Sequence, residues 1–256
     1  MRIDILTLFP EMFEGPLSES ILRQAREKGL IDIRLTNIRD YARDKHRTAD
    51  DYQYGGGSGM VMKPEPIFEA IRDVQGDGSE VSETGAGADS GEAVVLLSAR
   101  GRLFDQELAR ELSECSRLIL VCGRYKGVDE RVSQLATHEV SVGDYVLTGG
   151  ELPAAIVVDA VSRLVPGVLG AMESAETDSH FDGLLGPPVY TRPEEYEGDV
   201  VPEVLLSGNH ERIRVWRRTE ALRATRQRRP ELLAKIELSD EDREILELIE
   251  EESGQE

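Results

Sequence analysis

Three glycine-containing stretches have the composition of loops that bind a small molecule through main-chain groups. They are YGGGSGM at residues 54–60, CGRYKG at residues 122–127 and GDYVLTGGELP at residues 143–153. Glycine lets the backbone approach a ligand closely and point its amide and carbonyl groups at it. None of the three fits the dinucleotide-binding or P-loop pattern, and an ordinary tight turn would explain each one taken alone. Together they indicate a small-molecule pocket without identifying the molecule.

Metal-binding and nucleophilic residues are few and scattered. The histidines show no metal-ligand spacing among themselves or with the cysteines, so we expect no metal site. The N-terminus MRIDILTLFP lacks the order of a signal peptide, which favours two reduced thiols over a disulfide. A thiol nucleophile has no support, because neither cysteine has a histidine beside it in the sequence. The residues concerned are His46, His138, His180, His210, Cys115 and Cys122.

Charge is distributed very unevenly along the chain. The formal net charge is −20, yet residues 211–230 contain eight arginines and two glutamates, a local charge of +6. Residues 237–256 contain ten acidic residues and one arginine, a local charge of −9. A concentrated basic segment on an acidic protein could bind a polyanion while the remaining surface repels it. A solvated helix face is the alternative, and composition does not decide between them.

The elements that would position these loops alternate between strands and helices. Strand-like apolar runs occupy residues 3–8, 31–35, 93–97 and 118–122, with a weaker run at 139–142. Helical patterns occupy residues 18–28, which end at Gly29 as a C-cap, and residues 66–74, 105–114 and 128–135. This alternation predicts an α/β fold with a mainly parallel sheet and helices on both faces. Loops that leave the same end of such a sheet converge where these sheets bind ligands.

Later segments have different characters. Residues 153–165 form a helix that is apolar on most sides, so it is either a central core helix or one shared with a second subunit. Residues 76–91 are rich in glycine, serine and acid, which predicts a disordered surface insertion. Periodicity fails after Gly170 through AMESAETDSHFDGLLGPP, as in an interdomain linker. Asn209 is a candidate N-cap for a charged helix that begins ERIRVWRR.

Several long blocks, in order, resemble the bacterial tRNA (guanine-N1)-methyltransferase family (the TrmD family) of the SPOUT class. The strongest is VSVGDYVLTGGELPAAIVVDAVSRLVPGVLG. The other blocks are HRTADDYQYGGGSGM, CGRYKGVDERV, TDSHFDGLLGPPVYTRP and VLLSGNHERIRVWRR. The resemblance extends from MRIDILTLFP to RRPELL, interrupted mainly by the acidic insertion, and leaves out the C-terminal tail.

The resemblance implies a deep trefoil knot and a division into domains. Residues 1–169 would form the knotted domain that binds S-adenosyl-L-methionine, residues 170–177 a flexible linker, and residues 178–256 a helical tRNA-binding domain with an acidic tail. The connection rules for ordinary sheets would not have predicted a knot. By matching motifs, the methyl donor would be held by Leu96, Leu97, Ser98, Gly123, Val142, Gly143, Asp144, Tyr145, Val146, Leu147, Gly149, Gly150 and Pro153.

The resemblance also implies a reaction and the residues that perform it. The product would be N1-methylguanosine immediately 3′ of the anticodon in tRNA, a modification that supports reading-frame maintenance. Asp178 matches the family's general base, which comes from the opposite subunit of a homodimer, so the active site would be composite. Arg163 matches the arginine that stabilises charge on the guanine. Residues expected to contact RNA are Arg214, Arg217, Arg218, His46 and Arg47.

Some points stay open at the level of sequence. Lys126 stands in CGRYKG where the family usually has glutamate, which puts a carboxylate role there in doubt, including assistance to a magnesium ion. His46 could face solvent instead of RNA. A knotted methyltransferase for another RNA position and a non-catalytic RNA-binding protein are the alternative functions. No run of about 18 apolar residues could span a membrane, and we expect a cytoplasmic protein.

Overall fold

The computed structural model describes residues 1–76, 91–170 and 177–253. The chain divides into two compact units, Met1–Gly170 and Ala171–Glu256, and each is described by itself. The predicted insertion at 76–91 and the predicted linker at 170–177 lie mostly outside the described residues. The trefoil knot stays a prediction. Among the described residues, no helix is both long enough and apolar enough to cross a membrane.

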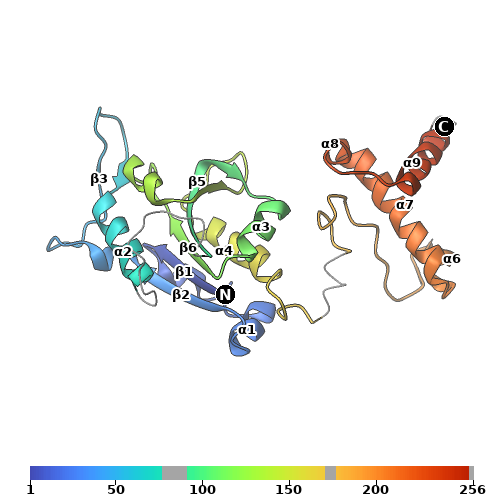
Figure 1. The fold of residues 1–256 in the computed structure, drawn as a ribbon, viewed down its shortest axis with the longest axis horizontal. Helices are drawn as coiled ribbons and strands as arrows, with labels where there is room; N and C mark the ends of the chain where they lie inside the picture. The colour runs from blue at the N-terminus through green and yellow to red at the C-terminus, as the bar shows by residue number, and fades with distance from the viewer. Residues whose placement is uncertain (77–90, 171–176, 254–256) are drawn as a thin grey trace. The chain divides into compact units, whose positions relative to one another are not determined.

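The first unit is built on a five-stranded parallel sheet in the order β2-β1-β6-β5-β7 (Figure 1). This confirms the predicted α/β fold with a mainly parallel sheet. The central strands of this sheet are buried on both faces, which explains why they appear in the sequence as nearly continuous apolar runs. The strands are β1 (Arg2–Thr7), β2 (Asp32–Asn37), β5 (Glu92–Leu103), β6 (Arg117–Cys122) and β7 (His138–Ser141).

Helices cover both faces of this sheet, and alternate side chains of each strand face opposite layers. Ile3 and Ile5 of β1 pack with α1 (Ser20–Glu27), α3 (Gln106–Ser113) and α4 (Glu151–Ser162). Leu6, from the other face of β1, packs with α2 (Pro64–Gly76) and η3 (Glu130–Leu135). The period of two along a strand thereby gives two separate hydrophobic cores in one unit.

Most predicted helices are present, and their caps explain where they begin or end. Gly29, with φ of +68°, follows α1, and the Leu30 amide bonds the Ala25 carbonyl at 2.9 Å. Residues 128–135 were predicted as an α-helix, but the structure has the 3₁₀ helix η3 at Glu130–Leu135 instead. Such a short connector favours the tighter turn. Two further 3₁₀ turns are η1 (Pro10–Phe13) and η2 (Ile38–Tyr41).

The stretch YGGGSGM lies in a hairpin that was not predicted from the sequence. Its strands are β3 (Asp50–Tyr52) and β4 (Met60–Met62), which pair antiparallel. Four glycines of the connecting loop have positive φ, a conformation that side chains disfavour, and they are Gly55, Gly56, Gly57 and Gly59. Each strand is only three residues long, too short for a recognisable alternation of apolar and polar residues.

The second unit is mainly helical. It contains α6 (Glu203–Leu206), α7 (His210–Arg228), α8 (Pro230–Leu233) and α9 (Asp240–Ser253), and a small hairpin of β8 (Glu195–Tyr196) and β9 (Asp199–Val200). The predicted N-cap is confirmed, because the Asn209 side chain accepts the Arg212 amide at 3.1 Å. The core of the unit is formed by Leu184, Leu222, Ile245 and Ile249.

Candidate ligand pocket and catalytic residues

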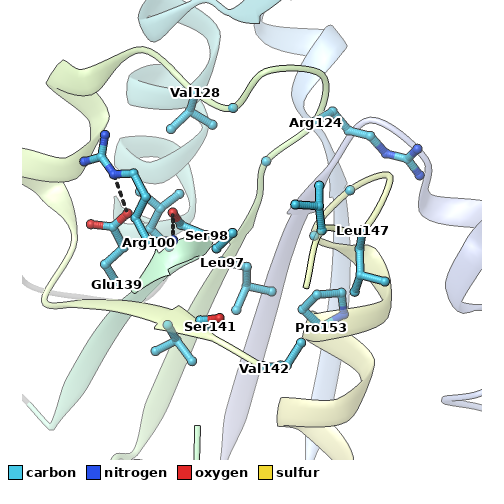
Figure 2. Close-up of a pocket in the computed structure, with 18 of the residues that line it drawn as sticks. Leu97, Ser98, Arg100, Arg124, Val128, Glu139, Ser141, Val142, Leu147 and Pro153 are labelled. Atoms are coloured by element: carbon cyan, nitrogen blue, oxygen red, sulfur yellow. Dashed lines mark hydrogen bonds and ion pairs between the residues drawn. The ribbon is translucent and has the colours of Figure 1, made fainter. Parts of the chain in front are cut away.

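A cavity of about 250 Å³ lies at the carboxyl ends of three neighbouring strands, β5, β6 and β7 (Figure 2). Three chain segments form its wall: the irregular part of β5 after Leu97, where its register with β7 shifts, the loop after β6 and the loop after β7. Two of the three glycine-containing stretches therefore meet at one cavity, as expected for loops that leave the same end of a parallel sheet. The third, YGGGSGM, approaches it only through Lys126 of the loop after β6.

Twelve of the thirteen residues expected to bind the methyl donor line this cavity. Asp144 is the exception and is exposed beside it. Apolar side chains point inward, among them Leu97, Leu147 and Pro153 (Figure 2). The lining residues from the expected set are Leu96, Leu97, Ser98, Gly123, Val142, Gly143, Tyr145, Val146, Leu147, Gly149, Gly150 and Pro153. Their contact with a ligand stays a prediction.

Gly150 shows why glycine is needed between the loops after β6 and β7. Its amide donates to the Gly123 carbonyl at 2.8 Å. A Cβ on Gly150 would lie 2.8 Å from the Cα of Cys122, closer than side chains and backbone can approach. Backbone therefore packs directly on backbone where the two walls of the cavity meet.

A buried ion pair supports the cavity from behind. The Arg124 Nε donates to the Glu151 carboxylate at 2.9 Å, and the Thr7 hydroxyl donates to the other carboxylate oxygen at 2.8 Å. Glu151 is 1% exposed, in the first turn of α4. The Arg124 guanidinium points away from the cavity (Figure 2) and lies over the Phe9 ring at 4.4 Å. Sequence analysis missed this pair, although an acidic residue opening an apolar helix is a signal for it.

Charged residues at the rim of the cavity are mostly paired. Arg100 lies 3.1 Å from Glu130 and 3.9 Å from Glu139. Arg131 pairs with Asp129 at 2.7 Å, and this contact lowers the pKa of Asp129. Across the described chain, no three histidine, cysteine, aspartate or glutamate residues are grouped so that they could hold a metal ion.

Lys126 is the lining cation for which the described residues provide no ion pair. Its amide donates to the Met60 carbonyl at 3.0 Å. Its side chain crosses Gly59 so closely that a Cβ there would lie 2.9 Å from the lysine Cγ. Lys126 thus joins the loop after β6 to the glycine-rich hairpin, and glycine at position 59 is what makes room for it.

Neither cysteine is suited to nucleophilic chemistry. Both are free thiols, and Cys122 is fully buried at the end of β6. Burial, reinforced by the nearby Glu151 carboxylate, raises the pKa of the Cys122 thiol well above its usual value. Burial also raises the pKa of Cys115. The nucleophilic form is the thiolate, so both residues stay in the unreactive thiol form near neutral pH.

The two predicted catalytic residues belong to different units. Arg163 is exposed and forms the C-cap of α4 in the first unit. Asp178 is exposed in a turn of the second unit, where its carbonyl accepts the Phe181 amide at 3.3 Å. Residues 171–176 lie between them, outside the described residues. The structure therefore places each residue within its own unit, and their meeting in one site stays a prediction.

The segment that holds Asp178 is folded, although it was predicted as part of an aperiodic linker. Leu184 is 1% exposed and belongs to the core of the second unit. The Leu185 amide donates to the Thr225 hydroxyl of α7 at 2.9 Å, and the Gly186 amide donates to the Ser179 hydroxyl at 2.8 Å. The buried Leu184 and the Leu185–Thr225 hydrogen bond attach the turn to α7, so the turn packs within the second unit.

The predicted RNA-contact residues differ in how available they are. His46 and Arg47 are exposed in the first unit, and Arg47 pairs with Asp40 at 3.1 Å. In the second unit Arg217 is exposed, whereas Arg214 and Arg218 form ion pairs with Glu241 and Asp242 of α9 at 2.7 and 2.6 Å. Their contact with RNA is untested by this geometry. Two of the three α7 arginines predicted to contact RNA, Arg214 and Arg218, have carboxylate partners within the chain.

Helix α4 is only partly covered within its own unit. Ala154, Val157, Val158 and Val161 are fully buried in the core. Leu152 and Ile156, one helical turn apart, are 52% and 45% exposed. Val146, in the loop that precedes the helix, is 89% exposed. The apolar character that the sequence shows around most of this helix therefore includes a side that the unit itself does not bury.

Fold and cavity together define a parallel α/β protein with a pocket bordered by the loops that follow its strands. The profile of the family described as tRNA (Guanine-1)-methyltransferase TrmD matches residues 1–235. The chain belongs to this family of methyltransferases.

Full-length relatives carry the name tRNA (guanine-N(1)-)-methyltransferase. The relative from Dictyoglomus turgidum is 56% identical over 256 residues, covering 100% of this chain and 99% of its own. The relative from Moorella thermoacetica is 54% identical over 256 residues, with the same coverage. The relative from Geobacter sulfurreducens is 54% identical over 253 residues, 98% of this chain and 99% of its own.

Proposed function

We propose that this protein transfers a methyl group from S-adenosyl-L-methionine to N1 of the guanosine immediately 3′ of the anticodon in tRNA, in the cytoplasm. Such a modification would support reading-frame maintenance. The observation that carries the proposal is the full-length similarity to relatives named tRNA (guanine-N(1)-)-methyltransferase. The cavity adds to it, because twelve of the residues matched to donor binding line one pocket.

The pocket suits a donor that combines an apolar part with many hydrogen-bonding groups. Leu97, Leu147 and Pro153 provide apolar surface, while the glycine backbone of both loops can approach polar atoms. When bound, S-adenosyl-L-methionine would supply an electrophilic methyl group on a positively charged sulfur. The role of these residues is to bind the donor and hold it in line with the accepting nitrogen.

Asp178 is the proposed general base. Guanine N1 carries a proton at neutral pH and becomes a good nucleophile only when that proton leaves. A carboxylate within hydrogen-bond reach can take the proton while N1 forms its new bond to carbon, which accelerates such steps by roughly 10²–10⁴-fold. The turn around Asp178 is attached to α7 by Leu184 and Leu185, which supports a fixed position for the carboxylate.

Arg163 is proposed to stabilise the guanine as it loses the proton. Negative charge then spreads onto the oxygen beside N1, and a guanidinium offers paired donors with a permanent charge. The base must also be unpaired, because N1 lies on its pairing edge. A purine of a single-stranded loop can be splayed into a pocket in this way.

The active site is proposed to be shared between two subunits of a homodimer. Asp178 and Arg163 would then come from different chains. The partly exposed apolar side of α4 supports this, because Leu152, Ile156 and Val146 are positioned to be covered by a second copy. The partner is a second copy of this chain in a closed two-fold arrangement, in which each interface residue appears twice.

A magnesium ion is not part of the proposal. The carboxylates at the cavity rim are held by arginines, as in the pairs Arg100–Glu130 and Arg131–Asp129. Among the residues that the structure describes, no cluster of three metal-ligating side chains is present. Within one chain the described residues form no resident metal site, and we derive no step through one.

The experiment is methylation of unmodified tRNA with isotopically labelled donor, followed by nucleoside analysis and mapping of the modified position. The proposal predicts N1-methylguanosine 3′ of the anticodon, and none in a tRNA with adenosine at that position. A label on a ribose or on another base would favour a methyltransferase for a different RNA position. Donor and tRNA binding without any transfer would favour a non-catalytic RNA-binding protein.

A further inference from the structure

The arginines of α7 are paired with the acidic helix α9 along most of its length. Four contacts connect the two helices, with N–O distances of 2.6–2.9 Å. The pairs are Arg214–Glu241, Arg218–Asp242, Arg226–Glu250 and Arg223–Glu252. The basic segment and the acidic tail, which are separate features in the sequence, are therefore one electrostatic unit in the fold.

These four contacts are not equivalent. Arg218 holds Asp242 with two hydrogen bonds of 2.6 and 2.9 Å, and Asp242 is 2% exposed. The Ser239 amide also donates to the Asp242 carboxylate at 3.0 Å, so this pair is part of the packed unit. The side chains of Glu241, Glu250 and Glu252 are 45–63% exposed. The outer three pairs are therefore solvated contacts, which a phosphate group could replace.

Three other arginines of α7 have no ion pair among the described residues. They are Arg212, Arg217 and Arg228, and all three are exposed. Arg217 and Arg228 are eleven residues apart, which is close to three helical turns, so both lie on one side of α7. Arg212 has the same spacing from Arg223 and lies on the side of that paired arginine. The available positive charge of α7 is thereby limited to positions that α9 does not reach.

We propose that α9 is an internal polyanion that confines the RNA phosphate contacts of α7 to the arginines with which it does not pair: Arg212, Arg217 and Arg228. The inference rests on tRNA being the substrate and adds the surface that receives it. The family profile ends at residue 235, before α9 begins, and assigns no role to this helix.

The physical basis is competition for the same guanidinium groups. An arginine that already has a carboxylate partner gains less from a phosphate, because the carboxylate must first be displaced into solvent. Displacement exposes three glutamates beside the incoming RNA, and like charges repel. An RNA that contacts only Arg212, Arg217 and Arg228 avoids both the displacement of carboxylates and the repulsion. The arrangement lowers the affinity for RNA in general and favours RNA that fits the remaining positions.

The test compares two triple variants of the full chain with the same change in charge. Glu241→Gln/Glu250→Gln/Glu252→Gln removes the α9 partners of Arg214, Arg226 and Arg223. It leaves Arg226 without a carboxylate partner among the described residues, whereas Arg214 and Arg223 keep Glu211 and Glu220 of α7. Glu244→Gln/Glu247→Gln/Glu251→Gln removes three charges from exposed positions of α9 for which the described residues show no ion pair. Both keep Asp242 and the core residues Ile245 and Ile249. Binding is measured against salt for two probes, an unmodified tRNA with guanosine 3′ of the anticodon and an unrelated RNA of equal length.

The proposal predicts that the first variant binds both RNAs about tenfold more tightly than the second at low salt. Its log–log salt dependence should be steeper by roughly 0.7–0.9 for each of Arg214, Arg223 and Arg226 that gains a phosphate contact. Equal affinities and equal salt dependences for the two variants would overturn the proposal. Methylation by the wild type is recorded in parallel, so that absence of methylation, which contradicts the proposed function, is distinguished from failure of this comparison.

A second comparison tests whether Arg217, one of the unpaired arginines of α7, contacts RNA. Arg217→Gln should weaken tRNA binding several-fold and flatten the salt dependence by roughly 0.7–0.9. The control is Arg243→Gln, which removes the same charge from α9, where Arg243 pairs with Asp240 at 2.8 Å. If Arg243→Gln weakens binding as much as Arg217→Gln does, the phosphate contacts are not confined to the unpaired arginines of α7.

Discussion

Arg124 and Glu151 form a 2.9 Å ion pair that joins the loop after β6 to the first turn of α4, directly behind the ligand cavity. Glu151 is 1% exposed, and the Thr7 hydroxyl occupies its second oxygen. Removing the charge of one partner of a buried pair leaves the other uncompensated, which is strongly destabilising. The ion pair therefore stabilises the first unit and holds the loop after β6, which lines the cavity, against α4.

Glu151→Gln should lower the free energy of unfolding by about 3 kcal/mol. Glutamine keeps the shape and can still accept from Thr7, so the loss isolates the charge. Thermal or urea unfolding measures it. Glu107→Gln is the matched control, because Glu107 is 83% exposed on α3, and its effect should stay within about 0.5 kcal/mol. A loss for Glu151→Gln no larger than the control would show that the pair contributes little.

Gly150→Ala should reduce donor affinity by tenfold or more, because a Cβ would press on the Cα of Cys122, 2.8 Å away. The two cavity loops would have to separate, and main-chain contacts to the donor would separate with them. Calorimetric titration with S-adenosyl-L-methionine measures the effect. Gly170→Ala is the control, since a Cβ there meets no atom within 4 Å. Unchanged affinity in Gly150→Ala would show that the close approach of the loops is not needed for binding.

The Arg218–Asp242 pair predicts how the second unit responds to acid. The hydrogen bonds from Arg218, followed by those from Ser239, lower the pKa of Asp242 to about 2 from its ordinary 3.8. A lowered pKa stabilises the folded state above the unfolded pKa, and this contribution is lost as the pH falls from about 4 towards 2. The difference corresponds to about 2 kcal/mol.

Trp216, the one tryptophan of the chain, lies in α7 and reports on this unit. Urea unfolding followed by its fluorescence should show stability falling between pH 5 and pH 2.5 more steeply in wild type than in Asp242→Asn. Asp240→Asn serves as the control, because its side chain is 97% exposed and it should keep the wild-type slope. Equal slopes for wild type and Asp242→Asn would contradict the assignment.

The composite site predicts that two inactive variants restore activity when combined. Arg163→Ala and Asp178→Ala chains should each be inactive as homodimers. After subunit exchange, half of the dimers would be mixed and each mixed dimer would have one intact site, giving about a quarter of wild-type activity. Methylation after mixing, compared with the unmixed variants, measures it. No recovery in a mixture that forms mixed dimers would place both residues of a site in the same chain.

The sequence predicted those features that depend on local patterns. Apolar runs identified all five strands of the parallel sheet, and Gly29 and Asn209 marked helix boundaries correctly. Features that depend on distant partners were missed. Thr7 and Glu151 are 144 positions apart, and only the folded sheet brings them together. The pairing of α7 with α9 was missed for the same reason, because each helix considered alone is a charged surface helix.

The resemblance and the residue patterns were informative about different parts of the site. The glycine pattern predicted a pocket built from the backbone of three loops; two of them meet at Gly123 and Gly150, whereas YGGGSGM does not line the cavity. Asp178 is one of fifty acidic residues, and its local sequence alone does not distinguish it from the others. Its turn lacks periodicity, yet Leu184 and Leu185 attach it to α7. Such a loop has no sequence signature because contacts that hold it, among them the Asp182–Arg218 ion pair at 2.5 Å, are made to residues distant in the sequence.

The most direct test of the mechanism is single-turnover methylation by wild type and Asp178→Asn, across pH, with saturating donor and tRNA. Asparagine keeps the shape of aspartate and can accept a hydrogen bond, but it cannot take the N1 proton. The mutant should be slower by roughly 10²–10⁴-fold, with donor affinity little changed. Raising the pH should partly rescue it, since solvent then removes the proton directly. A mutant within about threefold of wild type at neutral pH would contradict the assignment of Asp178 as the general base.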